Sequence, residues 1–130
     1  MPYANNNIMQ ITAAVKHNFR TGSRVLLVLM LMLIPYATLT PDPGTPEGSA
    51  PYMHLGGMAW VGLLACLSFE ANKTRAWAVL FVFAYSSLME LFQHYLPYRH
   101  GTWDDVWLNG MGCLAGAAIF AAVTGVLGKR

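Results

Sequence analysis

Four long runs of apolar residues, separated by short polar stretches, dominate the chain. They cover residues 25–39, 53–69, 76–96 and 106–127, and Pro35 interrupts the first. A helix needs about 20 apolar residues to cross a bilayer core of roughly 30 Å, so the last two runs are long enough. The first two are near the lower limit, and we expect the first to begin a turn earlier or to lie in a locally thinned bilayer.

The runs predict an all-α fold, namely an integral membrane four-helix bundle. None of them alternates apolar and polar positions, as the strands of a membrane barrel would. The composition agrees, because 55% hydrophobic and 11% charged residues are unusual in a soluble domain. With 130 residues, the chain has room for one four-span membrane domain, which we place at 24–130.

Residues 1–23 precede this domain and allow two interpretations. Apolar residues recur there at helical spacing beside basic ones, as in a helix that lies on a membrane surface: Ile8, Ile11, Val15, Lys16, Phe19 and Arg20. The alternative is a disordered polar tail, which Asn5–Asn7 would suit. We favour the interfacial helix. A cleaved signal peptide fits less well, because Tyr36–Leu39 is a poor match to the small-residue pattern of a cleavage site.

The basic residues predict the orientation. Seven of the eight flank the same ends of the runs: Lys16, Arg20, Arg24, Lys73, Arg75, Lys129 and Arg130. Cytoplasmic loops are enriched in Lys and Arg, so we expect both termini in the cytoplasm and the loops at 40–52 and 97–105 outside. Arg99 is the exception. A net charge of +2, spread in small groups, does not indicate nucleic-acid binding.

Polar residues fall on one face of each of the last two runs. In the third run they are Ser86, Ser87, Glu90, Gln93 and His94, and in the fourth they are Asp105 and Asn109, followed by Gly112 and Gly116. A short connection makes the two helices antiparallel neighbours, so these faces should meet. Polar groups within a membrane are costly and usually mark a functional site. The glycines should allow close helix packing, within the chain or in a homo-oligomer.

Three other polar features belong to the same predicted outer end. His54 begins the second run, as an interfacial residue or as a member of the site. Arg99 would either pair with Glu90, Asp104 or Asp105, or bind a phosphate or carboxylate group. One of the two aspartates is explained by capping of the fourth helix, where negative charge meets the positive end of the helix dipole.

These residues together resemble the VanZ-like family of small bacterial membrane proteins. The resemblance rests on His54, Glu90-Leu-Phe-Gln93, Pro97-Tyr-Arg99 and Asp105-x₃-Asn109-x₂-Gly112-x₃-Gly116, and it covers the second to fourth runs. It implies a multi-pass protein of the bacterial inner (cytoplasmic) membrane with a role in the cell envelope, and the family is named after a glycopeptide (teicoplanin) resistance determinant. Relatives commonly carry Asp-Lys where this chain has Ala50-Pro51.

Familiar enzyme motifs are missing from the sequence. It has no Gly-x-Ser-x-Gly, His-Glu-x-x-His, P-loop or Cys-x-x-Cys motif. A metal site built from His54, His94, Glu90 and Asp105 is chemically conceivable, but the spacing is not diagnostic. We therefore predict no metal and no cofactor.

Three functions remain open. The favoured one is binding of a lipid-linked or glycopeptide-related envelope ligand at the outer face, through His54, Glu90, Gln93, Arg99, Asp105 and Asn109. The second is an enzyme for a membrane-embedded substrate, with Glu90, His54 or Asp105 as acid or base. The third is a structural protein whose polar groups join helices, with Gly112 and Gly116 as a packing or dimer face. Membrane lipids are the expected surroundings in all three.

Overall fold

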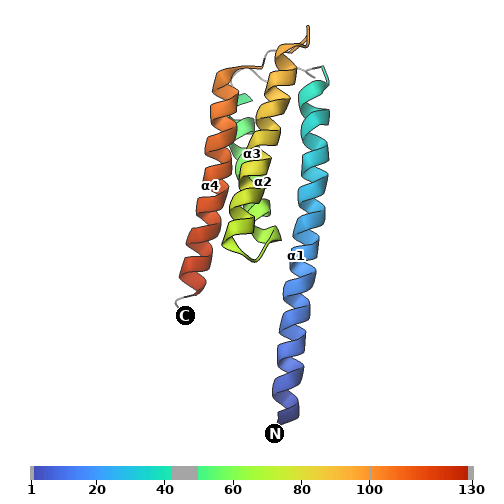
Figure 1. Ribbon diagram of the computed structural model, residues 1–130, viewed down its shortest axis with the longest axis vertical. Helices are drawn as coiled ribbons and strands as arrows, with labels where there is room; N and C mark the ends of the chain where they lie inside the picture. The colour runs from blue at the N-terminus through green and yellow to red at the C-terminus, as the bar shows by residue number, and fades with distance from the viewer. Residues whose placement is uncertain (1, 42–49, 100, 129–130) are drawn as a thin grey trace.

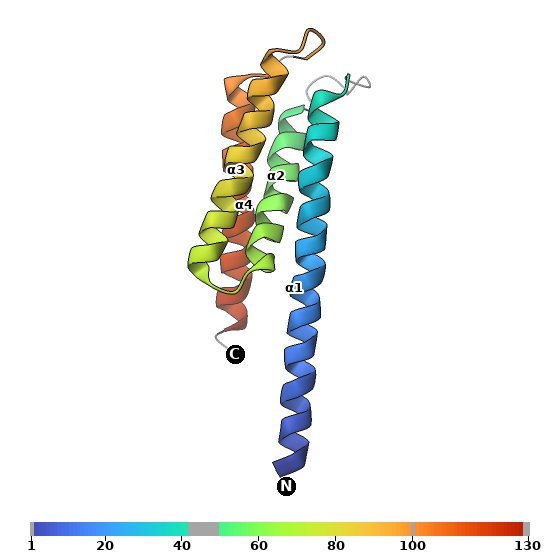
Figure 2. The same ribbon diagram turned by 45° about the vertical axis from the view of Figure 1, so that its right-hand side comes forward.

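Four α-helices make up the computed structural model, which describes residues 2–41, 50–99 and 101–128. They are α1 (Pro2–Leu39), α2 (Ala50–Ser68), α3 (Asn72–His94) and α4 (Trp103–Leu127). The described residues contain no strand, so the all-α prediction is confirmed. α2, α3 and α4 lie side by side with the second half of α1, whereas the first half of α1 extends beyond the other helices (Figures 1 and 2).

Three of these helices are long and apolar enough to cross a membrane. The stretches are Asn7–Leu39, Asn72–His94 and Trp103–Leu127. α2 is not among them, since Pro51, Tyr52 and His54 in its first turns lower its mean hydropathy. The structure therefore supports a membrane protein with three apolar spanning helices among the described residues, and a fourth crossing by α2 stays a prediction.

The core of the bundle is centred on α2. Val61, Leu64 and Ala65 of α2 are buried together with Val82 of α3 and Cys113 of α4. α2 contacts all three other helices, and most extensively α4. Many large apolar side chains of the other helices point outward, as expected where lipid rather than water surrounds a bundle.

Glycines bring α2 and α4 into close contact. A Cβ added at Gly112 would lie 2.7 Å from the carbonyl oxygen of Leu55, and one at Gly62 would lie 2.7 Å from that of Cys113. A Cβ at Gly116 would collide with the Ala59 carbonyl. Side chains at these positions would push the helices apart. The face that carries Gly112 and Gly116 is thus covered by α2 of the same chain, and a dimer through it would have to displace α2.

Pro35 does not end the first helix, although it interrupts the apolar run. A proline inside a helix has no N–H to donate, so the carbonyl four residues earlier loses its partner. Here that carbonyl belongs to Leu31, and it accepts a hydrogen bond from the hydroxyl of Tyr85 in α3 at 3.0 Å. Tyr85 thereby replaces the missing donor and joins α1 to α3.

The N-terminal residues continue α1 without a break. The helix passes through residue 23, where the sequence suggested a boundary, and its apolar residues there are exposed, with Ile11 64% and Phe19 58% accessible. The described part of this region is helical rather than disordered. Its position on a membrane surface stays a prediction.

A polar cluster where three helices meet

His54, Glu90, Asp105 and Asn109 converge from three helices at one end of the bundle. His54 Nδ1 lies 3.1 Å from Asn109 Oδ1 and 3.6 Å from Glu90 Oε1. The second ring nitrogen, His54 Nε2, lies 3.8 Å from Asp105 Oδ1. Helical spacing predicted facing polar stripes on α3 and α4, with His54 as a candidate at the same end. The structure brings His54 of α2 into contact with both stripes. We call these four residues the polar cluster.

Asp105 is held in place by the start of α4. Thr102 is the N-cap residue, and its hydroxyl oxygen accepts from the backbone N–H of Asp105 at 3.3 Å. The same hydroxyl donates to Asp105 Oδ2 at 2.7 Å. The capping that the sequence suggested for Asp104 or Asp105 is therefore provided by Thr102. The two acids lie in the first turn, where the helix dipole favours negative charge.

Glu90 is the most buried acid of the polar cluster. Its side chain is 3% exposed, and its Oε2 has no hydrogen-bond partner among the described residues. The α3–α4 loop packs directly onto it, since a Cβ at Gly101 would collide with the Glu90 carbonyl oxygen. Gly101 and Thr102 were missed from the sequence, although a glycine before a capping threonine could have indicated a tight entry into α4.

The electrostatics of the polar cluster are those of two acids around one imidazole. Asp105 and His54 act on Glu90 from the facing helices, and the positive charge of Arg99 acts on it from the loop. The side chains of His54 and Asp105 are 24% and 19% exposed. The polar cluster is therefore partly exposed at His54 and Asp105, while the Glu90 carboxylate is buried. An unpartnered buried polar atom is destabilising, so its retention needs an explanation.

Gln93 and Arg99 bind the end of α1 in this structure. Gln93 Nε2 donates to Thr38 O at 2.6 Å, and Arg99 donates from Nε to Thr40 O and from Nη2 to Ala37 O, both at 2.8 Å. The last carbonyls of a helix have no partner within it, so these bonds satisfy groups that would otherwise be costly to bury. This partnership was missed from the sequence, because backbone acceptors leave no residue pattern.

The remaining polar residues of the α3 stripe lie outside the polar cluster. His94 is exposed, and its ring packs edge-on against Tyr95 at 5.8 Å. Ser86 and Ser87 both donate to the carbonyl of Phe83 one turn earlier. His94 is therefore not brought together with Glu90 and Asp105, which removes it from the metal-ligand set considered above.

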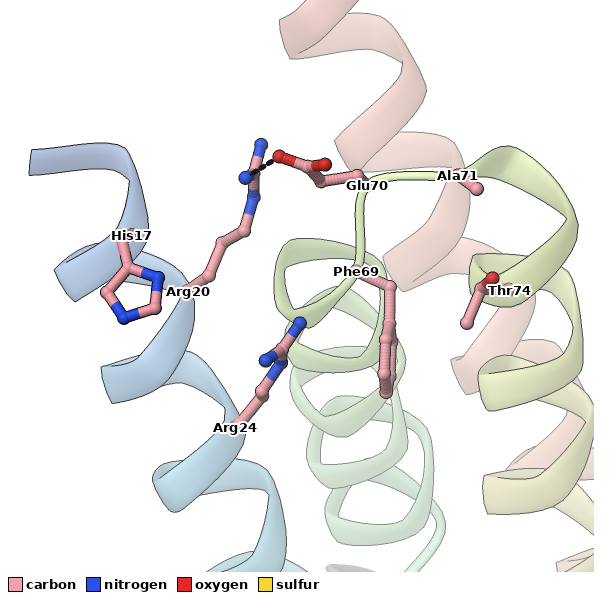
Figure 3. A pocket seen from close by; sticks show the side chains of 7 residues that line it. All are labelled: His17, Arg20, Arg24, Phe69, Glu70, Ala71 and Thr74. Carbon is pink, nitrogen blue, oxygen red and sulfur yellow. Dashed lines mark hydrogen bonds and ion pairs between the residues drawn. The ribbon is translucent and has the colours of Figure 1, made fainter. Parts of the chain in front are cut away.

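The opposite end of the bundle carries a basic hollow of about 400 Å³ (Figure 3). Arg20 and Arg24 reach from α1 toward the α2–α3 turn, where Arg20 pairs with Glu70. Arg24 Nε donates to Ser68 O at 2.9 Å, and Arg75 Nε donates to Phe69 O at 2.9 Å. Arg24 and Arg75 thus bind carbonyl oxygens at the end of α2, as Gln93 and Arg99 do at the end of α1.

The fold and the polar cluster define a small helical membrane protein in which one buried acid, Glu90, and one partly exposed acid, Asp105, face a histidine. The chain belongs to the VanZ/LLP1 family, because the model of that family matches residues 6–124. The match includes the whole polar cluster and confirms the resemblance drawn from its motifs. Neither the comparison with curated proteins nor that with solved structures gives a match.

Proposed function

We propose that the protein is a multi-pass protein of the bacterial cytoplasmic membrane, with both termini inside and the polar cluster at the outer end. The family supports the compartment, and the charge distribution supports the orientation. Figure 1 shows both ends of the chain and the α2–α3 turn toward the same end of the molecule, which is the basic end. Fusing a reporter enzyme to each terminus tests the proposed orientation. A terminal reporter that is active outside the cytoplasmic membrane would refute the cytoplasmic location of that terminus.

We further propose that the polar cluster binds the polar part of a lipid-linked or glycopeptide-related envelope ligand, and that this lowers susceptibility to a glycopeptide such as teicoplanin. One observation carries the proposal: Glu90 is buried beside His54 with an unpartnered carboxylate oxygen. A group that exists only to join helices would be expected to have its hydrogen bonds satisfied. His54 and Asp105, which are partly exposed, would contact the ligand first.

Gln93 and Arg99 take a supporting part in this proposal. Their bonds to Thr38, Thr40 and Ala37 fix the end of α1 beside the cluster. They would shape the wall of the site, while His54, Glu90, Asp105 and Asn109 supply its donors and acceptors.

An acid–base enzyme is the second candidate, because His54 lies between two carboxylates. An imidazole placed in this way can move a proton, with Glu90 or His54 as the acid or base. Chemical conversion of the ligand by the purified protein would separate this candidate from binding alone.

The proposal is tested by expressing the protein in a teicoplanin-susceptible bacterium. The wild-type chain should raise the inhibitory concentration, and His54→Gln should abolish that increase. His94→Gln is the matched control, since His94 is exposed and outside the polar cluster. Equal protection by wild type and His54→Gln, at equal amounts in the membrane, would contradict the proposal.

A further inference from the structure

We infer that the polar cluster binds one divalent transition-metal ion through His54, Glu90 and Asp105. Each residue offers one ligand atom, and these atoms lie within 4.8 Å of one another. Zn²⁺ binds nitrogen and oxygen at about 2.0–2.2 Å, so a tetrahedral site separates its ligand atoms by about 3.4 Å. Small side-chain movements would close the three groups around an ion, and three protein ligands leave one position open.

The donor chemistry fits such an ion. Two ionised carboxylates and a neutral imidazole carry a formal charge of −2, which a divalent cation would neutralise. Imidazole suits zinc and other first-row transition metals, whereas Mg²⁺ and Ca²⁺ prefer ligand sets made only of oxygen. An ion would also give the buried Glu90 carboxylate a partner, and the free Oε2 is the atom that lacks one.

The hydrogen bonds around the polar cluster orient the ligand atoms. If His54 Nδ1–H donates to Asn109 Oδ1, its Nε2 carries a lone pair that faces Asp105 Oδ1 at 3.8 Å. Two acceptors in that arrangement repel each other unless a cation lies between them. Thr102 meanwhile fixes the other oxygen of Asp105. A ligating histidine that donates its second N–H, and a carboxylate that is itself hydrogen-bonded, are typical of metal sites.

This inference goes beyond the proposed ligand and does not depend on it. A bound ion would supply positive charge at the outer end of the bundle, where an anionic part of an envelope ligand could reach the open position. The experiment below uses metal alone, so failure to bind metal would leave the teicoplanin test standing, and the reverse also holds.

The test is metal binding by the purified protein in detergent micelles after treatment with a chelator. Titration calorimetry with Zn²⁺ and with Mn²⁺ should give one site per chain for at least one of the two ions, with much weaker binding of Mg²⁺ and Ca²⁺. His54→Gln and Asp105→Asn should each weaken binding at least tenfold, and His94→Gln should leave it unchanged. Cobalt substitution gives a second readout, because the visible spectrum of Co²⁺ should report nitrogen ligation that is lost in His54→Gln.

Two results would overturn the inference. One is the absence of a stoichiometric site for any of these ions in the folded wild-type protein. The other is a site whose affinity and cobalt spectrum are the same in His54→Gln and Asp105→Asn. Either result would show that His54, Glu90 and Asp105 do not hold a metal ion.

Discussion

At the scale of single residues, Arg99 shows how a side chain can stand out in the sequence for one reason and act in the structure through another. Arg99 is the one Lys or Arg at the predicted outer end of the apolar runs. This exceptional position suggested that it binds an anionic group. Its hydrogen bonds to Ala37 and Thr40 show that it also binds the end of a helix 59 or more residues away. Sequence patterns could mark the residue but not these backbone acceptors.

Arg99→Ala should lower the free energy of unfolding by about 1–2 kcal/mol, because two hydrogen bonds from a charged group to helix carbonyls are lost. Arg99→Lys should lose less, since an ammonium can still reach one carbonyl but cannot bridge two as the guanidinium does. Unfolding in detergent, followed by circular dichroism, measures both. An Arg99→Ala protein as stable as wild type would show that these bonds contribute nothing.

The residues of the polar cluster were predictable to different degrees. Glu90, Asp105 and Asn109 follow from helical spacing, which places residues four apart on one face. His54 comes from a different run. It was included only because it was expected at the same depth in the membrane as the other three residues and because the family resemblance includes it. Thr102 and Gly101 were not found, because capping and close loop packing depend on the exact start of a helix, which an apolar run does not define.

At the scale of helices, the apolar runs located all four elements, and the ends of the helices differ from them by a few residues. The exception is the first half of α1, which has no apolar run and was predicted as a helix from the helical spacing of its scattered apolar residues. Pro35 was the other weak point, since sequence rules treat an interior proline as a break. The hydrogen bond that compensates for Pro35 comes from Tyr85 on another helix. The residues around Pro35 could not predict it.

The role of Tyr85 can be measured with a double-mutant cycle. Tyr85→Phe should lower the free energy of unfolding by about 0.5–1.5 kcal/mol, the usual range for one neutral hydrogen bond. In a Pro35→Ala background the new backbone N–H can bond the Leu31 carbonyl, so Tyr85→Phe should cost less. Equal losses in both backgrounds would show that Tyr85 does not compensate for Pro35.

At the scale of the whole molecule, side chains satisfy the carbonyl ends of helices at both ends of the bundle. Arg24 and Arg75 do so for α2 at the basic end, and Gln93 and Arg99 do so for α1 at the other. Against this background, the free oxygen of Glu90 is exceptional among the described residues. We therefore infer that Glu90 is kept for function rather than for stability.

The unfolding free energy of Glu90→Gln, measured in detergent with a chelator present, tests this claim most directly. Gln has nearly the same shape without the buried charge, so the variant should lie within about 0.5 kcal/mol of wild type or be more stable. A loss of more than about 1 kcal/mol would instead show that the Glu90 carboxylate makes a net stabilising bond, as interhelical glue would. That result would mean that Glu90 is kept for stability.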